Sequence, residues 1–305
     1  TTAVNEFQQV IDQNSRLAES YRAEGIAYYS EKAYPEAIAA FSRSLNNMDD
    51  PDKEFKKDVQ FYLAQARMDY GEVDKAIEVY SEILKAGEDE QAFFLRGKAY
   101  ISMEDYKNAE KDFQRALEGC EDYNLYINIY QIYVDHNKAV DGDAYLKMAL
   151  ELEPQDGEDC YHRGRIYEYE KNYEAARDEL KTAMEQGYED AMLLLGRVYL
   201  EMEDPASARS MYQEYLQKSE QGAKAYNGLA MCDIYDGAYD SALENIAQGL
   251  KENSKEDEQG LLYNEIVAYE YKRDFATAKE KMKIYLEQYP EDEAALRENE
   301  FLSTR

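Results

Sequence analysis

The sequence predicts an all-α fold, a solenoid in which antiparallel helix pairs follow one another along the chain. Two observations predict it. A small residue followed four positions later by a large apolar residue recurs eight times. The recurrences are about 34 residues apart, a period typical of repeats built from two helices. Residues four apart share one face of a helix, so each recurrence marks the packing side of one helix.

Four columns define the repeat. The small column holds Ala37, Ala76, Ala109, Gly142, Ala176, Ala208, Ala242 and Ala278. The large column holds Phe41, Tyr80, Phe113, Leu146, Leu180, Tyr212, Ile246 and Met282. Nine positions before the small column stand Tyr28, Tyr100, Tyr133, Tyr167, Tyr199 and Tyr269, and twelve before it stand Gly25, Ala64, Gly97, Gly164, Gly196 and Ala230. Small residues on both helices let two backbones approach closely, and the large residues fill the remaining space.

These anchors place the repeats in order along residues 18–290. The eight repeats begin near Ala18, Lys57, Glu90, Tyr123, Gly157, Glu189, Ala223 and Gln259. The first interval is longer because the segment around Pro51 forms a loop or extends a helix. Turn residues separate the helices within repeats, and Pro35 and Pro205 suit a first helical turn.

Two further helices flank the repeats. Residues 1–17 are predicted to form a leading helix. Residues 291–305 are predicted to form a C-terminal capping helix that shields the last apolar face from water. Because neighbouring repeats bury their apolar faces against each other, we expect one structural unit without separate globular domains.

These columns resemble the tetratricopeptide repeat. Repeat three reads Phe93, Gly97, Tyr100, Tyr106, Ala109, Phe113 and Ala116, and repeat five reads Gly164, Tyr167, Tyr173, Ala176, Leu180 and Ala183. The chain departs from the family pattern in having no Trp, in placing Arg96 and Arg163 where Leu is usual, and in holding the closing Pro only at Pro154 and Pro290. The resemblance implies a right-handed superhelix whose concave face, lined by the first helix of each pair, binds other proteins.

Composition excludes several classes of function. The chain has 35 basic and 65 acidic side chains and a net charge of −30, which opposes binding to nucleic acid or to anionic membranes. Hydrophobic residues make up 44% of the chain, enough for a folded core. No apolar run approaches the roughly 18 residues that would span a bilayer.

Candidate catalytic and metal-binding groups are few. Cys160 and His162 lie two residues apart, but Cys160 falls in a packing column, where a free cysteine acts as a small hydrophobe. A calcium loop would need Asp or Asn where the chain has Ala139, and Gly where it has Val140. The acidic residues around these two positions therefore do not fit a calcium loop. No known catalytic or phosphate-binding motif occurs in the sequence. We therefore expect no enzyme activity, metal or cofactor.

The predicted binding groove follows positions five and nine of the repeats, which share one side of the first helix. Its residues are Phe61, Phe94, Lys98, Ile127, Gln131, Tyr161, Arg165, Leu193 and Arg197. The apolar members would hold a peptide or helix of a partner protein, and the basic members would contact its acidic groups. In the alternative interpretation, neighbouring first helices cover these side chains, or the chain associates with itself.

The sequence thus predicts a protein-interaction scaffold, with a self-assembling structural solenoid or a surface-anchored assembly factor as the alternative. The chain begins at Thr1 rather than Met, which indicates a processed product. We expect an extracytoplasmic or cell-surface-anchored protein, for which a lipid anchor would be suitable, with a cytoplasmic bacterial scaffold as the alternative. The oligomeric state stays open.

Overall fold

A computed structural model describes residues 17–48 and 52–305, so the predicted leading helix lies outside the described residues except for Leu17. The described residues form 17 helices and no strand. The first helices of the pairs are α2 (Leu17–Ser30), α4 (Lys53–Tyr70), α6 (Glu90–Ser102), α8 (Tyr123–Asp135), α10 (Gly157–Tyr169), α12 (Ala191–Glu201), α14 (Ala223–Tyr235) and α16 (Lys255–Tyr271). The second helices are α3 (Tyr34–Asn46), α5 (Val73–Ala86), α7 (Tyr106–Ala116), α9 (Ala139–Leu150), α11 (Tyr173–Glu185), α13 (Pro205–Lys218), α15 (Tyr239–Lys251) and α17 (Phe275–Gln288). The last helix is α18 (Glu293–Ser303).

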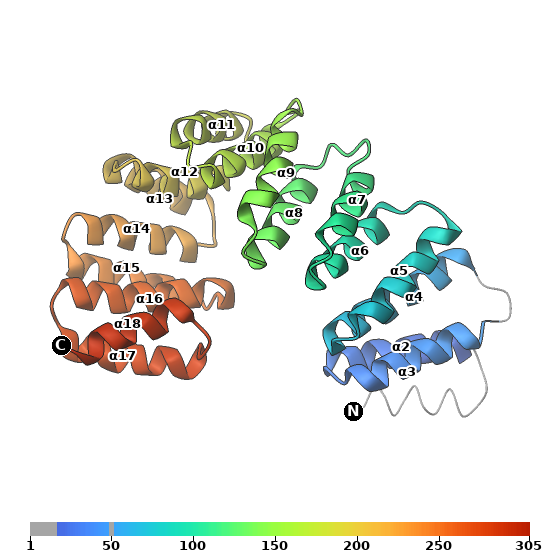
Figure 1. The fold of residues 1–305 in the computed structure, drawn as a ribbon. Coiled ribbons are helices and arrows are strands. Elements are labelled where there is room, and N and C mark those ends of the chain that lie inside the picture. Colours follow the sequence, from blue (N-terminus) through green and yellow to red (C-terminus); the bar gives the residue numbers. More distant parts are fainter. Residues whose placement is uncertain (1–16, 49–51) are drawn as a thin grey trace. The chain divides into compact units, whose positions relative to one another are not determined.

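Helices that follow one another along the chain pack as antiparallel pairs, as Figure 1 shows for α2 with α3 and for α14 with α15. The prediction of an all-α solenoid of helix pairs is confirmed. Pro35 and Pro205 lie in the first turns of α3 and α13, as expected, because a proline there removes no helical hydrogen bond.

The helices form two compact units rather than the single unit that we expected. The N-terminal unit comprises residues 1–149 and the C-terminal unit residues 150–305. The boundary falls at the end of α9, and residues 151–156, which include Pro154, form a non-helical connection to α10. The nearest-neighbour argument from the sequence did not anticipate that packing would divide at this connection.

In six of the eight helix pairs, a small residue on the first helix faces a large residue on the second, as repeats three and five illustrate. A Cβ atom built on Gly97 would lie 2.6 Å from the Phe113 ring, and one on Gly164 would lie 2.6 Å from the side chain of Leu180. Both large residues are fully buried. The pair can therefore close to this distance only because the glycines carry no side chain.

Tyr212 extends the same contact to the next repeat. Its ring meets Gly196 of its own repeat on α12, where a Cβ would be 2.6 Å away, and Gly228 of the next repeat on α14, where a Cβ would be closer still. Only 4% of Tyr212 is exposed. The ring thus fills a slot between two first helices and joins adjacent repeats.

Three repeats add an ion pair across the helix pair, each between residues 16 positions apart. Arg96 donates two hydrogen bonds to Asp112, at 2.7 and 2.8 Å. Arg163 and Glu179 lie 2.8 Å apart at the corresponding place in repeat five. Repeat eight reverses the charges, since Glu265 there accepts from Lys281 at 2.8 Å. Each salt bridge replaces an apolar contact between the two helices of a pair.

The turn within each pair has one residue in the left-handed region of backbone space, always five positions before the small column. These residues are Lys32, Gly71, Glu104, Asn137, Lys171, Glu203, Gly237 and Arg273. The N–H of the next residue donates a hydrogen bond to a carbonyl in the last turn of the first helix. In repeat five, Asn172 N–H donates to the carbonyl of Tyr167 at 2.8 Å. Only two of the eight are glycine, so most of these turns carry a conformational cost for a side chain with a Cβ.

We predict that Gly228→Ala destabilises the protein by about 1 to 3 kcal/mol, because its methyl group would enter the Tyr212 ring, which Gly196 holds from the other side. The matched control is Gly260→Ala in α16, whose Cβ would be 3.4 Å from Asn227 at its nearest contact. The control should gain up to about 1 kcal/mol from helix propensity. Chemical denaturation of both variants checks this, and equal effects would contradict the packing described.

We also predict opposite effects for two turn substitutions. Lys171→Gly should stabilise the protein by about 1 kcal/mol, because Lys171 has a φ of 57° and glycine adopts that conformation without steric cost. Gly71→Ala should destabilise it by a similar amount, and only through the backbone, because nothing lies within 4 Å of its added Cβ. Melting temperatures that shift in the same direction would exclude this explanation.

Candidate partner-binding site

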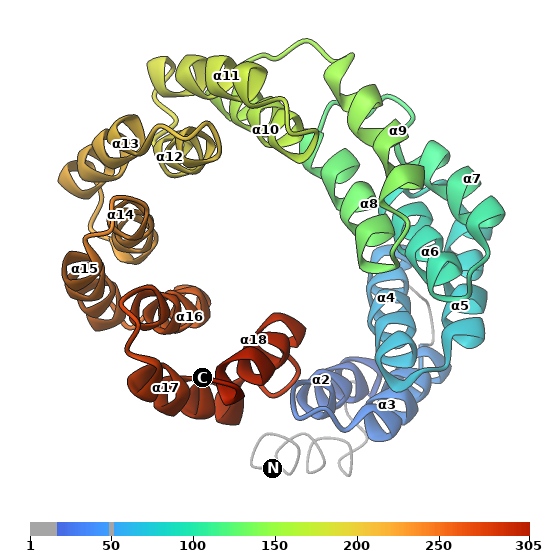
Figure 2. The same cartoon turned by 60° about the vertical axis from the view of Figure 1, so that its left-hand side comes forward.

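The first helices of the C-terminal unit share one edge of that unit, and the second helices share the other (Figure 2). A pocket of about 720 Å³ opens among α10, α12, α14 and α16 on the first-helix side. Its lining includes the side chains of Tyr161, Asp190, Leu193, Arg197, Tyr215, Lys224, Asn227, Met231, Glu252 and Asp257. A volume of this size is in the range of ligand-binding cavities in proteins.

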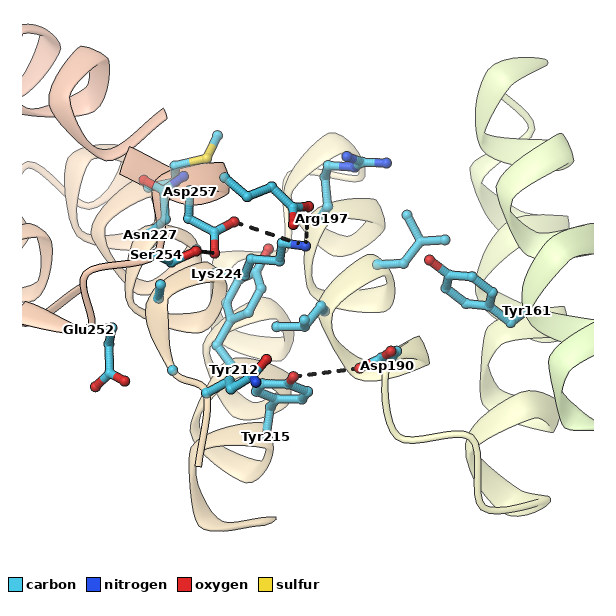
Figure 3. A pocket seen from close by; sticks show the side chains of 18 residues that line it. Tyr161, Asp190, Arg197, Tyr212, Tyr215, Lys224, Asn227, Glu252, Ser254 and Asp257 are labelled. Atoms are coloured by element: carbon cyan, nitrogen blue, oxygen red, sulfur yellow. Dashed lines mark hydrogen bonds and ion pairs between the residues drawn. The ribbon is translucent and has the colours of Figure 1, made fainter. Parts of the chain in front are cut away.

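The pocket has a buried aromatic floor and a partly exposed apolar wall. Tyr212 and Tyr215 are almost fully buried, whereas Met231 is 42% exposed. In Figure 3, Tyr161 approaches the pocket from α10, and Lys224 and Asp257 lie at its other side. The arrangement combines apolar contact surface with a polar rim, as protein-binding sites do.

Arg197, a predicted groove residue, lines the pocket but already has an acidic partner. Its guanidinium makes two contacts with Glu168 of α10, from Nε to Oε1 at 2.6 Å and from Nη2 to Oε2 at 2.7 Å. The Arg197 side chain is 57% exposed, and that of Glu168 only 14%. The bidentate pair fixes Arg197 across two repeats and neutralises most of its charge.

Arg165 lies on the same face outside the pocket lining and has no carboxylate partner among the described residues. Its Nη1 is 3.3 Å from Nδ1 of His162, and its guanidinium lies 5.9 Å from the centre of the Tyr161 ring. Tyr161 in turn packs against Tyr188, with ring centres 4.9 Å apart. The guanidinium is held by aromatic rings and stays available to an anion.

The polar end of the pocket was missed from the sequence. Lys224 donates to Glu256 at 2.9 Å and lies 4.0 Å from Asp257, while Ser254 donates to Asp257 at 2.6 Å. The hydrogen bond from Lys224 lowers the pKa of Glu256 and raises that of Lys224. Lys224 stands one helical turn before Asn227, on the same side of α14, so extending the groove pattern by one turn would have found it.

The predicted groove residues of the N-terminal unit have mixed environments. Phe61 and Phe94 are partly buried, with ring centres 6.3 Å from Tyr80 and 6.1 Å from Phe113. Ile127 is only 2% exposed. Its side chain therefore offers a partner almost no surface, as expected for a helix that is apolar nearly all round.

The two polar members of the predicted groove in that unit are exposed. Lys98 makes no ion pair with any described residue, and Gln131 donates to Asp135 of the same helix at 3.0 Å. The predicted groove residues thus fall into two sets, one on each compact unit. In the C-terminal unit, Tyr161, Leu193 and Arg197 come together around the pocket.

Cys160 and His162, weighed from the sequence as a reactive pair, are both buried. Burial raises the pKa of the Cys160 thiol, which disfavours the thiolate needed for nucleophilic attack. His162 is buried and lies 3.7 Å from Glu158. Across the described ranges, no group of three acidic, His or Cys side chains is placed to hold a metal ion, and no helix is long and apolar enough to cross a membrane.

Comparison with known proteins identifies the repeat. A tetratricopeptide repeat profile matches residues 1–52, 161–223 and 193–258, and a second profile of that description matches residues 90–122. These matches together cover more than half of the chain. No curated protein sequence matches it.

Two solved structures have a similar fold. A tetratricopeptide repeat protein from Parabacteroides merdae is similar over 83% of this chain and 100% of its own, with 12% identity and a TM-score of 0.52. Yeast Tom70 is similar over 93% of this chain and 74% of its own, with 15% identity and a TM-score of 0.54. At these identities the likeness concerns the fold alone.

At the C-terminal end of the first-helix face, α16 and α18 bring two carboxyl groups together. Burial, the charge of Glu298 and a hydrogen bond with Glu298 raise the pKa of Glu270 to about 7. The Oε1 atom of Glu270 is buried and accepts no hydrogen bond from the described residues. Glu270 is therefore protonated in the folded protein over a pH range in which the unfolded chain has lost that proton.

We predict that the free energy of unfolding falls as the pH rises from about 5 to 8, because the folded state must give up the Glu270 proton near pH 7 and the unfolded state near 4.5. Glu270→Gln should flatten this dependence and stabilise the protein at pH 8 by about 1 to 2 kcal/mol after solvent screening. The exposed Glu300→Gln, on the same helix as Glu298, should leave the dependence intact. Denaturation at pH 5, 6.5 and 8 distinguishes the three proteins.

Proposed function

Because the chain belongs to the tetratricopeptide repeat family, we propose that it is a protein-interaction scaffold that binds a peptide or helical segment of a partner on its first-helix face. The observation that carries the proposal is the pocket of about 720 Å³ on that face of the C-terminal unit. A segment laid across the first helices would bury side chains in the pocket and gain hydrogen bonds at its rim.

Two predicted groove residues and one further residue, Met231, supply the apolar part of this proposal. Tyr161 and Leu193 line the pocket and are partly buried, and the exposed Met231 lies beside them on α14. Large, partly exposed side chains around a buried floor are the usual anchors of a binding surface. We propose that Phe61 and Phe94 play the same part on the N-terminal unit.

Two basic groove residues are proposed to contact acidic groups of the partner. Lys98 and Arg165 have no carboxylate partner among the described residues, so pairing with a carboxylate of the partner costs them no existing ion pair. Arg197 was also predicted to make such a contact, but its bidentate pairing with Glu168 leaves little attraction for a further anion. The net charge of −30 argues against nucleic acid as the partner.

Self-assembly is the alternative function, and one observation favours it. Leu296 and Phe301 on α18 are 43% and 40% exposed, so the C-terminal helix presents apolar side chains to solvent. The native mass of the isolated chain at several concentrations separates the two functions. If the chain stays monomeric up to about 100 μM, the scaffold function is supported, because a chain that functions by self-assembly would associate well below that concentration.

We predict that Met231→Lys weakens peptide binding at least about tenfold without lowering the melting temperature, because Met231 is exposed in the free protein and covered in the complex. The probe is a set of peptides selected from a random 12-residue library on the immobilised full chain. Their affinities for wild type and variant are measured by fluorescence anisotropy.

The matched control is Ile284→Lys, which makes the same kind of substitution at a residue of similar exposure on α17, a second helix. This control should keep full affinity. Equal affinity for Met231→Lys and wild type, or equal loss in both variants, would overturn the placement of the binding site on the first-helix face.

A further inference from the structure

We infer that the segment bound in the pocket of the C-terminal unit places a basic side chain there, a lysine or an arginine. This inference rests on the proposed function and concerns the chemistry of the partner. It follows from which charges in the pocket are already paired within the chain, and it adds to the acidic contacts proposed for Arg165. The partner segment would then carry charges of both signs in a fixed order.

The two cations of the pocket are not available to a partner. Arg197 is held by both oxygens of Glu168, and Lys224 is held by Glu256 at 2.9 Å with Asp257 at 4.0 Å. Charge-assisted hydrogen bonds of this kind leave little electrostatic attraction for a further anion. The basic residues that line the pocket therefore do not make it an anion site.

The carboxylates outnumber the cations that could neutralise them. Asp190 and Glu252 line the pocket, and neither makes an ion pair with a described residue, although Asp190 lies near enough to Lys224 to help raise its pKa. Asp190 receives only the Tyr215 hydroxyl at 3.5 Å, a long hydrogen bond. Asp257 has Lys224 only at 4.0 Å and otherwise the Ser254 hydroxyl. After internal pairing the pocket keeps a net negative charge.

The rest of the lining suits the aliphatic stem and the charged end of a basic residue. Met231 offers an exposed thioether side chain against which methylene groups can pack. Tyr161 adds apolar surface at the pocket edge, but its ring already contacts Arg165 and Tyr188, so Met231 is the main contact for the methylene groups. A neutral apolar residue would make the same packing contacts but leave the carboxylates without a counter-charge.

The position of Arg165 gives the bound segment a direction. Arg165 lies on α10, whereas Lys224 and Met231 lie on α14 and Asp257 on α16. An acidic residue of the partner would lie over α10 and a basic residue over α14, so the reversed segment would place like charges together. Such an arrangement selects among partners and orientations more than it adds affinity.

The test uses the selected 12-residue peptides and the full chain, with the double variant Asp190→Asn, Glu252→Gln. We expect the selected peptides to be enriched in Lys and Arg relative to the unselected library. The double variant should bind them about tenfold more weakly, as loss of two ion-pair contacts implies. Raising the salt concentration from 20 to 200 mM should weaken binding to wild type.

The matched control is the double variant Glu244→Gln, Glu280→Gln, which changes the net charge equally on the second helices α15 and α17, where both residues are exposed. It should keep its affinity within about twofold. A second measurement needs no variant of the chain, since replacing the Lys or Arg of a selected peptide by Gln should weaken its binding to wild type about tenfold.

The outcomes separate this inference from the proposed function. Selected peptides that bind and depend on Met231, yet show no basic enrichment and no loss on the Gln replacement, would overturn the basic side chain alone. A library that yields no peptide above background would overturn both the scaffold proposal and this inference. If the pocket double variant and the second-helix double variant lost affinity equally, the loss would come from the change in net charge alone. That result would also overturn the assignment of the basic side chain to the pocket.

Discussion

The close approach of a small residue to a large one sets the geometry of this protein. Where Gly97 meets Phe113 and Gly164 meets Leu180, the two helices of a pair come as near as their backbones allow. Tyr212 transmits the same constraint to the next repeat through Gly228. The spacing of the first helices, and with it the width of the pocket between α12 and α14, follows from these contacts.

The sequence predicts this part of the fold well because packing of this kind leaves a local, periodic trace. Small and large residues must recur at fixed positions, so the helix pairs could be aligned without knowing where they lie in space. The ion pairs leave a weaker trace. Arg96 and Arg163 stood out only as departures from the family pattern, and their acidic partners become visible only when residues 16 positions apart are compared.

The candidate site was harder to predict. The position of a residue in the repeat predicts which way its side chain points, but it does not predict which side chains of other repeats contact it. Ile127 occupies a groove position and is buried by its neighbours. Arg197 occupies another and is paired with Glu168, one repeat away. Both outcomes depend on how repeats stack, as does the division into two units, and a single sequence contains no direct record of contacts between repeats.

The left-handed residue that recurs in every turn also limits how the chain can change in length. Because the turn closes with the same hydrogen bonds at the same distance from the small column, adding or deleting one residue there would rotate the second helix by about 100° and move its packing face away from its partner. Insertions are instead expected between repeats, where the longest interval already lies. A whole repeat is then the natural unit of duplication or loss, and the length of the chain would change in evolution by helix pairs rather than by residues.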